Sequence, residues 1–227
     1  MLSIISLIAY RVDRLSMNDA IYWILENGVL TLTGSGQMQN YSSTGGETYA
    51  NASKITKVIV GDGITSIGSY AFQNFAYYGT SGLVIEVGTG VETIESYAFT
   101  GCGYGCTGDV NITFKGAVKT IADHAFHQVG RQCKGNVMIN FTGAQINTIQ
   151  TYAFAQVGYS CTGDISLYFG CYDLSINDNA FNQIAYSSNG KLDIMFNGEV
   201  KSIGKYSFGS AAAYSKTGPV NIMFPNA

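Results

Sequence analysis

Charged side chains are scarce in this sequence: Asp, Glu, Lys and Arg together make up 12% of the 227 residues, which is about half of the usual share. Gly, Tyr, Ser, Thr and Asn are abundant instead, so the surface is expected to be polar but largely uncharged. The formal net charge is −3, and Lys and Arg occur as isolated residues and not in runs. Nucleic-acid binding needs a clustered basic surface, so we exclude that class of function.

Long apolar runs are missing as well. No run approaches the roughly 18 residues that a membrane-spanning helix requires, so no membrane insertion is expected. The opening segment MLSIISLIAY (residues 1–10) is apolar, but it has no basic segment before it and no small-residue cleavage site after it. It therefore lacks the pattern of a clear export signal. We interpret it as a first strand or helix that covers one end of the core.

Residues that usually perform catalysis or bind metals are few. The sequence has two histidines and five cysteines, and no two cysteines form a Cys-x₂-Cys pair of the kind that binds zinc. No combination of Ser, Cys, His and Asp suggests a nucleophile with its base. We therefore predict a protein that is not an enzyme and that has no metal site and no cofactor.

What the sequence does contain is a repeat. Six phenylalanines, which we call the repeat phenylalanines, follow one another at spacings of 27, 27, 28, 27 and 27 residues. Each has an isoleucine five residues before it and a small residue directly before it. A fixed period of this length is typical of stacked supersecondary units. The repeat phenylalanines are Phe72, Phe99, Phe126, Phe154, Phe181 and Phe208.

Each repeat unit divides into three segments. An alternating apolar segment such as VNITF (110–114) indicates a strand with one buried face. A glycine turn and a short apolar segment that ends in the repeat isoleucine follow it. The Ala-Phe segment then suits one helical or 3₁₀ turn. The sequence thus predicts a mainly β, leucine-rich-repeat-like solenoid of about six coils of 27 residues, with short strands and short helical or 3₁₀ turns.

The segment before the repeats has a different pattern. Residues 21–38 form two apolar runs joined by Glu26, Asn27 and Gly28, and Asn-Gly between such runs is a strong hairpin signal. We predict an N-terminal β-hairpin cap, because the end coil of a solenoid needs an atypical covering unit. The chain accordingly divides into an N-terminal segment with the cap (1–53) and the solenoid (54–227).

The repeat motif resembles that of a known family. ITSIGSYAF (64–72), VETIESYAF (91–99) and VKSIGKYSF (200–208) are similar to the repeat of the BspA-type leucine-rich repeat family. WILENGVLTLTGSGQMQNYSS (23–43), followed by ITKVIVGDGITSIG (55–68), resembles the cap and first repeat of many bacterial members. The similarity extends from about residue 21 to residue 227, although the 27-residue repeat is longer than the commoner repeat of the family. It implies a parallel-stranded solenoid with adhesive or binding roles in proteins that are mostly exposed at surfaces.

Two functions are consistent with these features. The first is a non-enzymatic binding or adhesive repeat protein of a microbial surface or secreted fraction, acting through protein-protein or protein-glycan contacts. Its location would be extracellular or at the cell surface. The alternative is a structural assembly component, such as a filament subunit or a phage or virion fibre or decoration protein, located in the virion.

The candidate binding residues form a column five residues after the repeat phenylalanines, with a further tyrosine, Tyr214, displaced by one residue. Aromatic faces with one cation suit a sugar or a protein partner. Alternatively, the same side chains stack on one another and only seal the edge of the coils. The column consists of Tyr77, Tyr104, Arg131, Tyr159 and Tyr186.

Three of the five cysteines, Cys106, Cys133 and Cys161, share a position seven residues after the repeat phenylalanine. Neighbouring members of this column could approach disulfide distance, and the odd total leaves at least one thiol free. Buried reduced thiols acting as small apolar side chains, or one disulfide, remain the alternatives for the cysteines, which also include Cys102 and Cys171, whereas their spacing disfavours a metal site.

The last unit lacks an obvious cap. The strand segment VNIMF (220–224) is followed by three residues, and an uncovered terminal coil presents apolar side chains and unpaired backbone groups to water. We therefore predict that another chain covers this face at Ile222 and Phe224. The covering chain would be a copy of this protein, giving end-to-end self-association, or a different component of a larger assembly.

Overall fold

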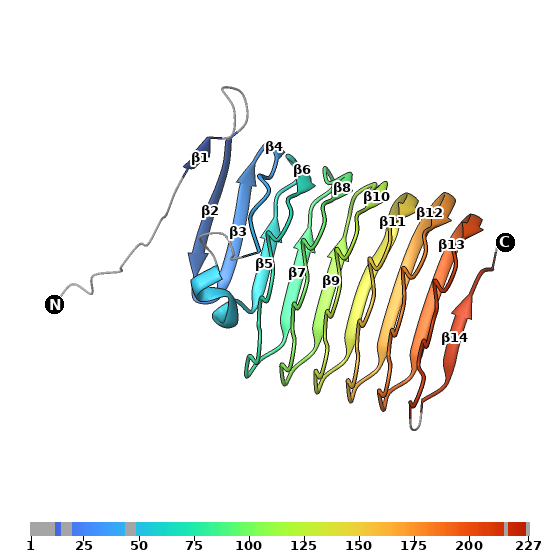
Figure 1. The fold of residues 1–227 in the computed structure, drawn as a ribbon. Coiled ribbons are helices and arrows are strands. Elements are labelled where there is room, and N and C mark those ends of the chain that lie inside the picture. The colour runs from blue at the N-terminus through green and yellow to red at the C-terminus, as the bar shows by residue number, and fades with distance from the viewer. Residues whose placement is uncertain (1–11, 15–19, 44–48, 216–217, 226–227) are drawn as a thin grey trace.

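The computed structural model describes residues 12–14, 20–43, 49–215 and 218–225. In Figure 1 the chain forms a stack of similar coils that runs from an N-terminal hairpin to the last strand. The apolar opening segment (1–10), for which we predicted a strand or helix, lies outside the described residues.

The coils build two stacks of parallel strands, in which each strand pairs with the equivalent strand of the next coil. The first stack contains β3 (Val29–Gly34), β5 (Lys57–Val60), β7 (Leu83–Val87), β9 (Val110–Phe114), β11 (Val137–Ile149), β12 (Ile165–Ile176), β13 (Leu192–Ile203) and β14 (Val220–Met223). The second contains β4 (Gly36–Gln37), β6 (Ile64–Ile67), β8 (Thr93–Ile94) and β10 (Thr120–Ile121), continued by the carboxyl ends of β11, β12 and β13. The predicted mainly β solenoid is confirmed, with about seven turns.

The predicted N-terminal hairpin is also confirmed. β2 (Ala20–Glu26) pairs antiparallel with β3, and β1 (Val12–Arg14) pairs antiparallel with β2. Asn27 and Gly28 have φ angles of 49° and 79°, the two positive values that a type I′ hairpin turn requires. Because β3 then pairs in parallel with β5, and β4 with β6, the cap contributes one turn to the stacks. The division of the chain at residue 53 stays a prediction.

The repeat phenylalanines form one continuous column inside the solenoid. Neighbouring ring centroids lie 4.8 to 5.2 Å apart, and only Phe208, in the last coil, is partly exposed. A second column of rings from the strands meets the first one edge-on. Each fully buried ring contributes roughly 1.5–3 kcal/mol of transfer free energy, so these columns dominate the stability. The second column consists of Phe114, Phe141, Phe169, Phe196 and Phe224.

The Ala-Phe segments differ locally from the expected helical or 3₁₀ turn. In every coil φ is positive two residues before the repeat phenylalanine and two, four and six residues after it. Around Phe99, Cys102 N donates to Phe99 O (3.1 Å), whereas Phe99 N donates to Ala125 O of the next coil (2.8 Å). Alternating φ signs with such i to i+3 bonds describe successive type II turns. The neighbouring coils thus bind the backbone groups that a helix would have paired internally.

Regular helix is rare in this fold. The 3₁₀ helix η1 (Tyr49–Lys54) precedes β5. Within the described part of the chain, no helix is long and apolar enough to cross a membrane.

Candidate binding site

The predicted column of candidate binding residues is a continuous ladder of stacked side chains. The ring centroids of Tyr77 and Tyr104 lie 5.1 Å apart, and those of Tyr159 and Tyr186 lie 5.0 Å apart with the rings nearly parallel. The structure therefore brings together all five residues that the sequence singled out. We call Tyr77, Tyr104, Arg131, Tyr159 and Tyr186 the tyrosine-arginine ladder.

Arg131 joins the two halves of the tyrosine-arginine ladder. Its guanidinium carbon lies 5.7 Å from the ring centroid of Tyr104 and 4.5 Å from that of Tyr159, within the range of cation-π attraction. Its Nη1 also donates to Gln156 Oε1 at 2.7 Å. The one cation of the ladder is thus held between two rings and oriented by an amide.

The ladder lies at the surface and not in the core. Tyr77 is 41% exposed, and Tyr104, Arg131 and Tyr159 are half-buried. Removal of one of these side chains would therefore cost less stability than removal of a repeat phenylalanine. The geometry is compatible with both alternatives, a binding surface and a seal of the coil edge.

A second aromatic ladder stands two residues before the repeat phenylalanines. Tyr70 stacks on Tyr97 at 4.9 Å, Tyr97 on His124 at 4.7 Å, and His124 on Tyr152 at 5.1 Å. Burial lowers the pKa of His124, and burial together with His124 and Arg131 lowers the pKa of His127 to about 4. Both imidazoles are therefore neutral at pH 7, and His124 takes the place of a tyrosine.

Amide side chains occupy the position two residues after the repeat phenylalanine, between the two aromatic positions of each turn. Gln128 Nε2 donates to Gln156 Oε1, and Gln156 Nε2 donates to Gln183 Oε1, both at 2.8 Å. We call this row of Gln128, Gln156 and Gln183 the amide ladder. In the coil before it, Gly101 holds the same position and has no side chain to continue the row.

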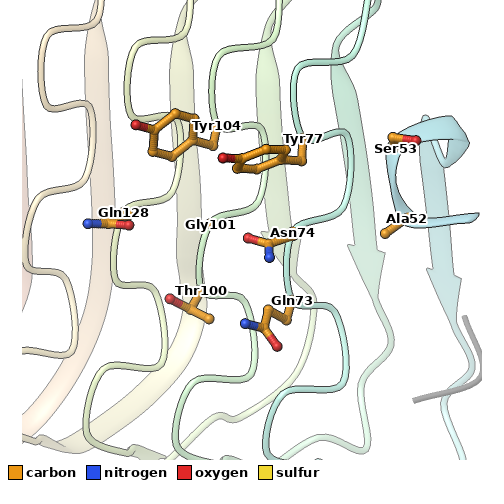
Figure 2. Close-up of a pocket in the computed structure, with 9 residues that line it drawn as sticks. All are labelled: Ala52, Ser53, Gln73, Asn74, Tyr77, Thr100, Gly101, Tyr104 and Gln128. Carbon is orange, nitrogen blue, oxygen red and sulfur yellow. The ribbon is translucent and has the colours of Figure 1, made fainter. Parts of the chain in front are cut away.

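An open hollow of about 550 Å³ lies in this face at Gly101. Figure 2 shows Tyr77 and Tyr104 along one side, Gln73 and Thr100 along the other, and Asn74 between them. Two members of the tyrosine-arginine ladder therefore line the hollow, whereas Arg131, Tyr159 and Tyr186 do not. The described lining residues are Ala52, Ser53, Gln73, Asn74, Tyr77, Thr100, Gly101, Tyr104 and Gln128, and none of them is charged.

The polar lining residues of this hollow were not among the residues predicted from the sequence. Gln73, Asn74, Thr100 and Gln128 stand one or two residues after a repeat phenylalanine. The feature of the sequence that could have indicated the hollow is the position two residues after the repeat phenylalanine, where a series of amide side chains is interrupted by Gly101. A glycine within a stack of equivalent side chains indicates a hollow at the surface, because the coils on both sides still carry side chains at that position.

The cysteine column is a row of close, buried thiols. The sulfurs of Cys106 and Cys133 lie 3.2 Å apart, without a disulfide, and Cys161 is the next in the row. The neighbouring Cys133 thiol and burial raise the pKa of Cys106 and of Cys161. Both neighbours can donate S–H groups to Cys133, which lowers the pKa of that central thiol relative to theirs. Over the described ranges, no group of His, Cys, Asp and Glu side chains is placed to hold a metal ion.

The predicted assembly face lies on the last described coil. Ile222 pairs in register with Ile194, the ring of Phe224 stacks on that of Phe196 at 5.0 Å, and both Ile222 and Phe224 are half-buried. On the far edge of β14, no strand among the described residues pairs with it.

Comparison with known proteins relates the chain to one family. A family model described as BspA type leucine rich repeat region matches it with six copies, over residues 42–157 and 73–215. Among solved structures, the chain is similar to the crystal structure of a leucine-rich repeat protein from Eubacterium ventriosum, with 17% identity and a TM-score of 0.39 over 93% of this chain and 72% of that one. A comparison with curated proteins found no match.

Proposed function

Because the chain belongs to the BspA-type leucine-rich repeat family, we propose that it is a non-enzymatic binding protein of a microbial surface or secreted fraction. Proteins of this family are generally surface binding proteins. The proposed partner is a protein or a glycan, and the proposed binding surface is the turn face that carries the tyrosine-arginine ladder.

The stacking of this ladder is the observation that supports the proposal most. Tyr and Arg are the residue types that contribute most to binding surfaces, and here they lie in a row with neighbouring tyrosine rings about 5 Å apart. Side chains that are already fixed by stacking lose little conformational freedom when a partner binds. A rigid row of aromatic faces is therefore well prepared for contact with an extended partner.

The test is truncation of the ladder. Tyr104→Ala, Arg131→Ala and Tyr159→Ala should each weaken binding to immobilised matrix proteins or glycans by about tenfold, measured by surface plasmon resonance. The midpoint of thermal unfolding should change little, because these side chains are half-buried. Tyr172→Ala is the matched control, since Tyr172 is 66% exposed and lies outside the ladder.

Two results would contradict this proposal. If all three variants lose thermal stability equally and binding is unaffected, the ladder seals the coil edge. If the unmodified chain binds no protein and no glycan in such a panel, the chain is not a binding protein of this kind.

An assembly component is the second candidate, such as a filament subunit or a virion fibre or decoration protein. The open edge of β14, with Ile222 and Phe224 half-buried beside it, favours this candidate. Light scattering at micromolar concentration should then detect multimers of the unmodified chain, and the double variant Ile222→Lys, Phe224→Lys should be monomeric. A monomeric unmodified chain would reject self-association.

A further inference from the structure

The hollow at Gly101 exists because one coil lacks a side chain that the next three coils have. Gln128, Gln156 and Gln183 fill the equivalent space and hydrogen-bond to one another. At Gly101 an added Cβ would collide with Asn74 Oδ1. In place of a glutamine side chain the second coil has the Asn74 amide of the preceding coil beside Gly101, whereas each of the following three coils carries a glutamine at this position.

The polar wall of the hollow is rich in groups that both donate and accept hydrogen bonds. The amides of Gln73, Asn74 and Gln128 each offer an oxygen acceptor and an NH₂ donor. Thr100 Oγ1 donates to His127 O at 3.0 Å, which leaves its lone pairs free to accept. Gln73 Oε1 is buried and has no hydrogen-bond partner among the described residues. An unsatisfied buried acceptor costs about 1–3 kcal/mol, so a rotation of this amide towards a ligand hydroxyl would relieve that cost.

The other wall is aromatic. Tyr77 and Tyr104 stand 5.1 Å apart with their rings tilted by 33°, and Tyr77 is 41% exposed. Aromatic rings of this kind pack against apolar C–H surfaces while their hydroxyl groups remain in water. A ligand for this site therefore needs an apolar face beside a rim of hydroxyl or amide groups.

The charge of the site restricts the ligand further. None of the described lining residues is charged, and Arg131, the cation that stacks on Tyr104, is engaged with Tyr159 and Gln156. A charged ligand would lose hydration without gaining an opposite charge. The volume of about 550 Å³ lies within the range of small-molecule sites, roughly 300–1,000 Å³.

We propose that the hollow formed by Gln73, Asn74, Tyr77, Thr100, Tyr104 and Gln128 binds a neutral saccharide, an inference that rests on the proposed binding function and specifies its ligand. A pyranose ring presents an apolar C–H face to Tyr77 and Tyr104, and its equatorial hydroxyls reach the amides and Thr100. Amide-bearing sugars such as N-acetylhexosamines offer an additional donor and acceptor to the same wall.

Gly101→Gln is the decisive variant, because it fills the hollow with a side chain that the fold already accepts at this position. Gln128, Gln156 and Gln183 have φ angles of 61°, 59° and 56°, close to the 70° of Gly101. The end of the Asn74 side chain must rotate to make room, as a flexible group can. Ser210→Gln is the matched control, since Ser210 holds the same position in the last coil with φ of 54° and lies outside the hollow.

The probe is an array of neutral oligosaccharides of hexoses and N-acetylhexosamines, with sialylated and sulfated glycans beside them. The unmodified chain should bind at least one neutral oligosaccharide, and titration calorimetry with that compound should show a loss of at least about tenfold for Gly101→Gln and no change for Ser210→Gln. If thermal unfolding shows that Gly101→Gln is misfolded, Gln73→Leu replaces it, with the same expected loss.

Three results would overturn the inference. The first is that no neutral oligosaccharide binds at millimolar concentration, and the second is that Gly101→Gln and Gln73→Leu bind as well as the unmodified chain. The third is preference for sialylated or sulfated glycans that Arg131→Ala abolishes. In each case, the proposed binding function would still hold if the chain bound a protein or another glycan and Tyr159→Ala weakened that binding. If the chain bound no partner at all, both the saccharide inference and the proposed binding function would be contradicted.

Discussion

His127 is a residue whose protonation opposes folding. Burial is the main cause of its pKa of about 4, and the positive charges of His124 and Arg131 act in the same direction. The equivalent residues of other coils, such as Gln73 and Asn182, carry no charge. The neutral form of His127 is thus the one that fits the turn face.

The stability of the chain should therefore depend on pH. The unfolded imidazole binds a proton below about pH 6.5, whereas the folded one does so only near pH 4, so the unfolded state binds more protons in between. The free energy of unfolding should fall as the pH falls from about 6.5 to about 4. After a discount for partial exposure, His127 should account for about 1–2 kcal/mol of this fall.

His127→Gln tests this dependence, because it places the residue of the first coil at the same position. Urea unfolding at about pH 7 and about pH 4.5 should show a smaller difference for this variant than for the unmodified chain. His124→Tyr serves as a comparison, since the pKa of His124 is lowered too. Equal differences for the unmodified chain and both variants would show that other groups cause the loss.

At the scale of elements, the turn of each of the first five coils is matched to the strand that follows it, whereas in the last coil Ala212 precedes Val220, which is 47% exposed. The turn position in question lies four residues after the repeat phenylalanine. In three coils this position is glycine and the following strand starts with a β-branched residue, whereas in two coils it is alanine and the strand starts with leucine. An added Cβ at Gly130 would collide with Cγ2 of Val137, whereas leucine branches one carbon farther out and leaves room for an alanine. The pairs are Gly103 with Val110, Gly130 with Val137, Gly158 with Ile165, Ala76 with Leu83 and Ala185 with Leu192.

This matching predicts a coupled pair of substitutions. Gly130→Ala alone should destabilise the fold by about 1–3 kcal/mol through overpacking. Gly130→Ala combined with Val137→Leu reproduces the pair found at Ala185 and Leu192, so the double variant should be more stable than Gly130→Ala alone. Urea unfolding of the four proteins gives the coupling energy, expected at about 0.5–3 kcal/mol. Strict additivity of the two single effects would contradict the matching.

The sequence predicted the strands better than the turns. The alternating segments 83–87 and 110–114 coincide with β7 and β9, because alternation is a local signal of one buried face. The positive φ angles of Tyr97 and Gln128 have no comparable signal, since hydrogen bonds to neighbouring coils impose them. The conformation of the turn thus depends on contacts 27 residues apart.

One part of the candidate site could likewise be predicted from the sequence and another part could not. The tyrosine-arginine ladder followed from the repeat, because residues of equal phase stack on one another in a solenoid. The hollow depends on the missing side chain of Gly101 and on the distance from Tyr104 to Gln73 across the turn. Such a distance is a property of the folded turn, whose form the sequence alone did not reveal.

At the scale of the whole molecule, one apolar cluster extends from Ile21 in the hairpin to Phe196 in β13. Every coil contributes the same kinds of residue to it, and each coil contacts its direct neighbours through the parallel strands. Stability therefore accumulates through neighbour interfaces, and a coil in the middle has two of them while a coil at either end of the stack has one.

The parallel pairing of the coils also determines how the molecule responds to tension. The strands lie across the stack and their hydrogen bonds run along it (Figure 1), so a force applied between β3 and β14 loads the coil interfaces in series and opens them one at a time. Each coil that detaches releases 27 or 28 residues, which lengthens the chain by about 90 Å when fully extended. A force-extension recording should show steps of this size. A binding protein built in this way would unfold one coil at a time under flow or shear, and the coils that remain folded would stay bound to the partner.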